Sequence, residues 1–206
     1  MLENTKAIIF DLGGVILDID YQLTLDAFAK LGAKDFNQHY TQAAQTGVFD
    51  EYETGKVSSE FFVNKLLDFL PQGTQPNQVV HAWNAMIKEL PLENLDVLKR
   101  LQGKYRTFVL SNTNDLHLDF FHQLLKKYDP NLKLDDYLEK VYFSSQIGFR
   151  KPDPQAFQYV IEQNGLNPAE TLFIDDTARH LEGAKKCGLK TFHFTKGAYQ
   201  LASIFE

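Results

Sequence analysis

Carboxylate side chains follow two short apolar runs of this chain, at the points where buried strands would end. Asp11 comes after the run Ala7 to Phe10, and the pair Asp175 and Asp176 comes after the run Thr171 to Ile174. A buried carboxylate can serve as a nucleophile, and two adjacent carboxylates are costly to hold together unless a cation neutralises them. Ligation by oxygen atoms alone favours Mg²⁺ over zinc.

Uncharged and cationic side chains follow two further apolar segments. Ser111 and Asn112 come directly after Thr107 to Leu110, and their hydroxyl and amide groups could hydrogen-bond phosphoryl oxygens without adding charge. Lys151 stands before a proline in a stiff segment, so an ordered backbone would present its ammonium group. Arg150, its neighbour, is expected to lie on the surface.

Strands and helices must alternate along the chain to bring these residues together. Five apolar runs have the length of buried parallel strands: residues 7–10, 107–110, 141–143, 171–174 and 191–194. Helical patterns separate them, which predicts an α/β fold with a doubly wound, mainly parallel, Rossmann-like sheet. Because ligands bind at the carboxyl ends of the strands in such sheets, all four groups of polar residues should converge there.

The region from 21 to 90 breaks this alternation, because it contains helical patterns and no convincing strand. Ser58 fits the N-cap of one helix, and Pro76 opens another. We therefore predict a catalytic core formed by residues 1–18 and 92–206, and a small all-helical cap of residues 19–91 inserted after the first strand.

The composition restricts the partners of the chain. Its 206 residues include 21 Lys and Arg against 27 Asp and Glu, and the net charge of −6 argues against nucleic acid, whose phosphate backbone calls for a basic surface. No segment approaches the roughly 18–20 apolar residues of a membrane span, and no apolar signal region precedes the first strand. The single cysteine, Cys187, weakly favours a reducing compartment. We expect a cytoplasmic protein that acts on a small molecule; the composition leaves the oligomeric state open.

Together, these motifs resemble those of the haloacid dehalogenase-like (HAD) hydrolase superfamily, from Ile8 to about Gly188. The segments that carry the resemblance are Phe10-Asp11-Leu12-Gly13-Gly14-Val15, Leu110-Ser111-Asn112, Lys151-Pro152 and Phe173-Ile174-Asp175-Asp176. The helical insertion is similar to the cap of the branch whose cap follows the first motif. More narrowly, three segments resemble bacterial sugar-phosphate phosphatases of the α-glucose-1-phosphate phosphatase type: Asp11-Leu12-Gly13-Gly14-Val15, Ser111-Asn112-Thr113-Asn114 and Tyr52-Glu53-Thr54-Gly55.

This resemblance implies a Mg²⁺-dependent phosphatase that hydrolyses a small phosphomonoester, such as a hexose 1-phosphate. Asp11 would attack phosphorus and form an aspartyl-phosphate, which water then hydrolyses. Mg²⁺ would be held by Asp11, the carbonyl of Gly13, and one or both of Asp175 and Asp176. The residues implied to bind the phosphoryl group or balance its charge are Ser111, Asn112 and Lys151.

The cap would select the substrate by closing over the site. Candidates for its inner face are Phe49, Tyr52, Glu53 and Trp83. The helical spacing around Trp83 favours packing in a core, whereas the carboxylate of Glu53 could accept hydrogen bonds from sugar hydroxyl groups.

One position departs from the superfamily pattern. Most of its phosphatases carry a second Asp two residues after the nucleophile, as general acid and base, and here that position is Gly13. General acid help is worth about two to four powers of ten in rate and matters least for a good leaving group, so a sugar 1-phosphate would suffer least. Asp18 and Asp20 remain alternative proton donors, and His117 and His180 are expected to be solvated or packed helix residues.

Two other functions stay open at this point. A 2-haloacid dehalogenase also lacks the second Asp, because halide needs no proton, although the pair Asp175 and Asp176 suits a metal that dehalogenation does not use. The other is a catalytically weak phosphate-binding regulatory module that has lost turnover together with the acid.

Overall fold

The centre of the protein is one parallel sheet of five strands. The computed structural model describes residues 2–34, 36, 40, 47–195, 197 and 200–205. The strand order is β3-β2-β1-β4-β5, and every neighbouring pair is parallel. The strands are β1 (Ala7–Phe10), β2 (Arg106–Ser111), β3 (Lys140–Phe143), β4 (Thr171–Asp175) and β5 (Lys190–His193). The predicted α/β fold with a parallel sheet is confirmed.

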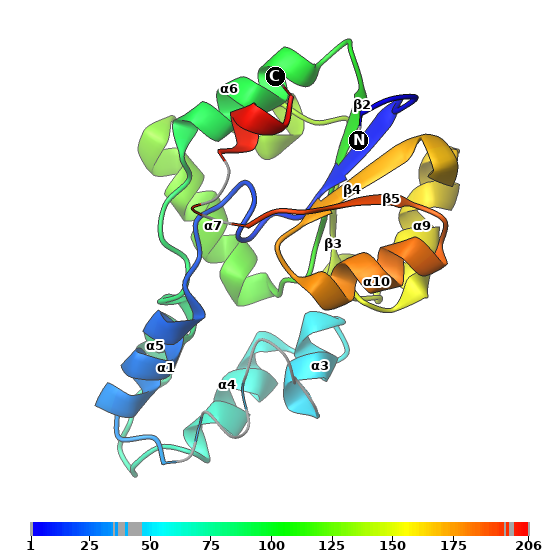
Figure 1. Cartoon of the computed structure of the whole chain (residues 1–206). Coiled ribbons are helices and arrows are strands. Elements are labelled where there is room, and N and C mark those ends of the chain that lie inside the picture. Colours follow the sequence, from blue (N-terminus) through cyan, green and yellow to red (C-terminus); the bar gives the residue numbers. More distant parts are fainter. Residues whose placement is uncertain are drawn as a thin grey trace.

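Helices cover both faces of this sheet (Figure 1), with α6 and α7 on one face and α9 and α10 on the other. The core helices are α6 (Leu92–Leu101), α7 (Asp115–Tyr128), α8 (Ser144–Ile147), α9 (Pro154–Asn164) and α10 (Ala178–Lys186), and short 3-10 turns lie at Leu134–Asp136, Pro168–Glu170 and Leu201–Ile204. Among the described residues, no helix has the length and apolar character needed to cross a membrane.

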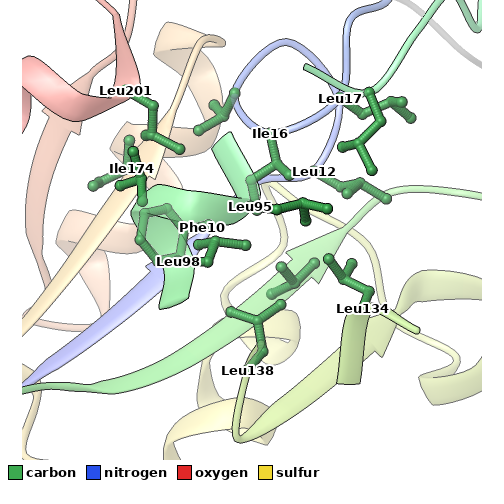
Figure 2. Packing of buried hydrophobic residues seen from close by; sticks show 14 of the residues in the cluster. Phe10, Leu12, Ile16, Leu17, Leu95, Leu98, Leu134, Leu138, Ile174 and Leu201 are labelled. Carbon is green, nitrogen blue, oxygen red and sulfur yellow. The ribbon is translucent and has the colours of Figure 1, made fainter. Parts of the chain in front are cut away.

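The central strand β1 supplies both halves of the core, because side chains alternate along a strand. Ile8 and Phe10 pack into the cluster that contains α6, α7 and the C-terminal turn, and Figure 2 shows Phe10 among these leucine and isoleucine side chains. Ala7 and Ile9 pack with α9 and α10 instead. A continuous apolar run is what a strand covered on both faces needs, and this run ends just before Asp11.

The insertion after β1 is helical, as predicted, and its helices form a group of their own beside the sheet (Figure 1). They are α1 (Tyr21–Lys30), α3 (Val48–Glu53), α4 (Ser59–Leu67) and α5 (Pro76–Asn84). Ser58 caps α4 by accepting a hydrogen bond from the backbone N–H of Phe61 at 3.2 Å, as predicted. The ring of Trp83 meets those of Tyr40 and Phe62 edge to face, so Trp83 belongs to the core of the cap itself.

Two linkers join the cap to the sheet, and they pair with each other. Ile19 and Ile87 form an antiparallel bridge. The backbone N–H of Asp18 donates to the carbonyl of Glu89 at 2.9 Å, and that of Lys88 donates to Asp18 at 3.0 Å. The entry and exit of the cap are therefore held side by side.

The N-terminus of α7 reaches into the cap and makes a second joint. Trp83 Nε1 donates to Asn114 Oδ1 at 3.3 Å, and the backbone N–H of Leu116 donates to the hydroxyl of Tyr52 at 3.1 Å. His117 stacks on Trp83, with its Nε2 lying 3.2 Å from the Trp83 carbonyl and its Nδ1 lying 3.1 Å from Asn114 Nδ2. A carbonyl only accepts, so Nε2 carries the proton and Nδ1 accepts from Asn114.

This joint should make stability depend on pH. Burial lowers the pKa of His117 to about 4, whereas an unfolded histidine has a pKa of about 6.5. Between these values the unfolded chain binds the proton more readily, so the free energy of unfolding falls as pH drops from about 6.5 to 4, by up to about 3 kcal/mol. A His117→Gln variant, which does not titrate here, should lose correspondingly less over this window in urea unfolding at pH 7.5 and 4.5. Equal losses in both proteins would contradict the assignment.

Candidate active site

The first carboxylate of the site lies at the carboxyl end of β1, in the middle of the sheet. The backbone N–H of Asp11 donates to the carbonyl of Ile174 at 2.8 Å and so continues the pairing with β4. Asp11 Oδ1 accepts from the backbone N–H of Leu12 at 2.6 Å and lies 2.9 Å from Lys151 Nζ. One carboxylate oxygen is thus fixed by two donors.

Two glycines turn the chain after Asp11, but only the second position requires glycine. Gly14 has a φ of +79°, and a Cβ there would overlap the Asp176 carboxylate, so only glycine fits. Gly13 has no positive φ, and a Cβ there would meet the tip of the Ile19 side chain, 2.8 Å from its Cδ1. The turn therefore brings the backbone of this loop against Asp176.

Lys151 is fully buried, with an exposed fraction of 0%. Its Nζ lies 2.7 Å from Asp175 Oδ2 and 2.9 Å from Asp11 Oδ1. Burial disfavours the charge, but Asp11 and Asp175 outweigh it and raise the pKa of Lys151, which remains an ammonium group. This cation joins the carboxylates that follow β1 and end β4.

The two carboxylates at the end of β4 have different surroundings. Asp175 also accepts from the backbone N–H of Thr177 at 2.7 Å and from His180 Nδ1 at 3.0 Å. Burial works to raise its pKa, but Lys151 and His180 hold the pKa of Asp175 below its usual value. Asp176 instead lines the cavity, and burial followed by the neighbouring Asp175 raises its pKa. Asp175 is satisfied by protein groups, and Asp176 faces the space where a ligand would lie.

Asp11 and Asp176 line the same cavity, and a cation bound between them would contact both carboxylates. Ligand atoms of Asp11, Asp175 and His180 lie within 4.8 Å of one another, but the ammonium of Lys151 already contacts both carboxylates and would repel a metal there. Burial and then Asp175 raise the pKa of Asp11 well above its usual value, even though Lys151 works to lower it. Negative charge crowded in this way, between Asp11 and Asp176, is what a divalent cation relieves.

Ser111 and Asn112, at the end of β2, both line the cavity as predicted from the sequence. The Asn112 side chain also has a structural role that the sequence did not indicate. Its Nδ2 donates to the carbonyl of Lys151 at 2.8 Å, and its Oδ1 accepts from the Lys151 N–H at 2.8 Å. Asn112 therefore holds the backbone that carries Lys151, and the second N–H of its amide leaves its predicted role toward a phosphoryl group as a prediction.

Arg150 is not on the surface, so that expectation was wrong. Only 12% of its side chain is exposed, Nη1 lies 3.0 Å from Asp50 Oδ1, and Nη2 lies 2.9 Å from Glu53 Oε2. Both carboxylates belong to α3, so Arg150 ties the cap to the loop that also carries Lys151. The neighbouring sequence carries no signal for this pairing, because Asp50 lies 100 residues earlier in the chain.

The cap and the core together line a cavity of about 70 Å³ that opens to solvent. From the cap, Tyr21, Tyr40 and Glu53 line it. Glu53 is thus in the predicted place, whereas the two tyrosines were missed because aromatic residues in a helical pattern resemble core positions. The other candidates for the inner face pack inside the cap: Phe49, Tyr52 and Trp83.

Asp18 and Asp20, the alternative proton donors, lie in the linker and at the start of α1 and not at the cavity. The Asp20 side chain accepts from the backbone N–H of Gln22 and caps α1, and the backbone of Asp18 pairs the linkers. Neither residue is among the described residues that line the cavity. His117 lines the cavity from the cap joint, and His180 lines it beside Asp176.

Comparisons with known proteins agree with this geometry. A model of haloacid dehalogenase-like hydrolases matches residues 5–188. The chain is 36% identical over 194 residues to a D-ribitol-5-phosphate phosphatase from Bacteroides thetaiotaomicron, covering 94% of this chain and 93% of the relative. A HAD-family enzyme from the same organism, crystallised in mutant form with magnesium and inorganic phosphate, superposes with a TM-score of 0.91 at 29% identity, covering 98% of this chain and 99% of the other. A HAD-like hydrolase from Porphyromonas gingivalis superposes with a TM-score of 0.86 at 31% identity, covering 98% and 96%. The chain belongs to the haloacid dehalogenase-like hydrolase family.

Proposed function

We propose that this protein is a Mg²⁺-dependent phosphatase that transfers the phosphoryl group of a small sugar or sugar-alcohol phosphate to Asp11 and then to water. The observation that carries the proposal is the buried ion cluster of Asp11, Lys151 and Asp175, next to a cavity that Asp11 and Asp176 line. The relative named for D-ribitol 5-phosphate, and the structural neighbour crystallised with magnesium and phosphate, support the same chemistry.

Asp11 is placed to act as the nucleophile. Its Oδ1 is held by Leu12 and Lys151, which leaves Oδ2 to attack phosphorus. A bond then forms between Asp11 and phosphorus while the bond from phosphorus to the sugar oxygen breaks, and the sugar oxygen takes a proton from solvent. Water next attacks phosphorus, which releases inorganic phosphate and restores the carboxylate. The ammonium of Lys151 balances negative charge on Asp11 and on the incoming phosphoryl group.

The donor set on the open side of Asp11 fits Mg²⁺. Asp11 and Asp176 offer carboxylate oxygens and Gly13 offers a backbone carbonyl, and hard oxygen ligands are those that Mg²⁺ prefers. Asp175 instead holds Lys151, so Asp176 is the direct metal ligand of this pair. When bound, the metal neutralises charge on the phosphoryl oxygens.

The substrate side of the cavity favours a hydroxylated leaving group. Glu53 and Arg150 form a pair of acceptor and donor at the wall, and Tyr21 adds a hydroxyl. A sugar hydroxyl can donate to a carboxylate and accept from a guanidinium group at the same time. Two substrates fit this wall: a hexose 1-phosphate, whose leaving group needs least help from an acid at Gly13, and a pentitol 5-phosphate, which the named relative favours.

The nucleophile and the metal can be tested in one screen of phosphate release over hexose 1-phosphates, hexose 6-phosphates and D-ribitol 5-phosphate. We expect activity that a chelator abolishes and a loss in kcat of more than about a thousandfold in Asp11→Asn, because no other group replaces a nucleophile. With no acid at Gly13, the 1-phosphate of a sugar should react faster than its 6-phosphate.

The control for this screen is Asp96→Asn, which changes an exposed carboxylate on α6 and should keep full activity. Turnover of 2-haloacids that survives the chelator would favour the dehalogenase alternative. Tight binding of sugar phosphates with no phosphate release would favour the regulatory module. Equal rates on 1- and 6-phosphates would remove the leaving-group argument.

The two carboxylates at the end of β4 should respond differently to substitution. Asp176→Asn should raise the Mg²⁺ concentration for half-maximal activity by at least about tenfold, because a direct ligand is weakened. Asp175→Asn should mainly lower kcat at saturating Mg²⁺, because Lys151 loses its buried partner. Titration of activity with Mg²⁺ measures both, and the opposite pattern would reverse the two assignments.

Glu53 should affect sugar phosphates more than an aryl phosphate. Glu53→Gln is expected to lower kcat/KM for the best sugar phosphate by about tenfold, the loss for one hydrogen bond to a charged group. Its effect on p-nitrophenyl phosphate should be small, because that substrate has no hydroxyl for the wall to bind. Glu51→Gln, an exposed change on the same helix, is the matched control. An equal loss on both substrates would mean that Glu53 supports the fold and not specificity.

A further inference from the structure

His180 approaches the site from the first turn of α10, four residues after Asp176. Its exposed fraction is 7%. Nδ1 lies 3.0 Å from Asp175 Oδ2 and 3.2 Å from Asp175 Oδ1. Nε2 is buried without a hydrogen-bond partner among the residues that the structure describes. The imidazole therefore hydrogen-bonds to Asp175 through Nδ1 alone among its two nitrogens.

The proton of this ring can be assigned from its partner. A carboxylate accepts hydrogen bonds, so Nδ1 donates and Nε2 is bare. Burial lowers the pKa of His180, which favours a neutral ring near pH 7. A neutral donor orients the carboxylate of Asp175 without placing a second positive charge beside Lys151.

A line of direct contacts leads from His180 to the nucleophile. His180 donates to Asp175, Asp175 contacts Lys151 Nζ at 2.7 Å, and Lys151 contacts Asp11 Oδ1 at 2.9 Å. The backbone N–H of Thr177 also donates to Asp175, at Oδ1. Rotation about the last torsion of an aspartate is soft, and a lysine has a flexible four-carbon stem, so neither group is rigid by itself.

We propose that His180 is a positioning residue of the phosphatase: its Nδ1 holds the Asp175 carboxylate in the orientation that presents Lys151 to Asp11. This inference rests on the proposed function, because its effect is felt at the nucleophile. It gives a physical role to a histidine that lies outside the four sequence motifs. Without this donor, the carboxylate and the ammonium group that follows it would shift, and a displacement of about 1 Å can cost about a hundredfold in rate.

Three substitutions at this position separate the two nitrogens. His180→Asn keeps a donor near the place of Nδ1, His180→Gln places an amide near Nε2, and His180→Ala removes both. We expect His180→Ala to lower kcat by about ten- to a hundredfold with little change in KM, and His180→Asn to recover most of that loss. The loss should be equal on p-nitrophenyl phosphate and on the best sugar phosphate, because positioning acts before the leaving group departs. His122→Ala, an exposed change on α7, is the control and should retain wild-type rates.

Three results would overturn the inference. Wild-type rates in His180→Ala would mean that Asp175 needs no such support. Recovery by His180→Gln and not by His180→Asn would mean that Nε2 acts in the cavity. A loss confined to the sugar phosphate, which has the poorer leaving group, would mean that His180 donates a proton and does not position Lys151.

A spectroscopic measurement decides the geometry even if the variants fold poorly. In the wild-type protein, two-bond ¹H–¹⁵N spectra should report a neutral His180 with its proton on Nδ1, and a proton on Nε2 alone would refute the contact with Asp175. This readout also separates the two proposals. A wild-type protein that releases no phosphate defeats the proposed function, whereas the tautomer still tests the position of His180.

Discussion

The site depends on one buried ion cluster, in which the ammonium group of Lys151 lies between Asp11 and Asp175. Removing charged groups from water costs several kcal/mol each, so such a cluster persists only where its members are paired and hydrogen-bonded. The parallel sheet supplies the two carboxylates from neighbouring strands. Asn112 grips the backbone of Lys151, and His180 supports Asp175 from α10. The ion cluster therefore depends on the strand order, which places β1 and β4 side by side.

Three separate sets of contacts hold the cap to this core, and each uses a different type of interaction. The linkers pair through their backbones, the start of α7 meets Trp83 through neutral hydrogen bonds, and Arg150 pairs with Asp50 and Glu53. These contacts fix the position of the cap residues that line the cavity relative to Asp11. A cavity formed in advance loses less entropy on binding than one that must be ordered by its ligand.

Much of the fold could be predicted because it follows from local patterns. Buried strands need continuous apolar runs, and helices need caps such as Ser58, so both are visible in the sequence. The partners of polar groups are not local: Asn112 meets Lys151 across 39 residues, and Arg150 meets Asp50 across 100. Nothing near Arg150 in the sequence distinguishes a buried pair from a solvated surface charge. The family resemblance predicted that the four motifs meet at one site. The partner of each polar side chain within that site depends on packing between distant segments, which the sequence does not show.

The contrast between the two glycines after Asp11 bears on how such an enzyme can change over evolutionary time. Position 14 is closed to every side chain, because the Asp176 carboxylate occupies the space beside it. Position 13 faces a movable isoleucine tip, and its backbone angles suit ordinary residues. The loop could therefore accept an aspartate at position 13, the residue that the resemblance leads one to expect there, if the Ile19 side chain shifted.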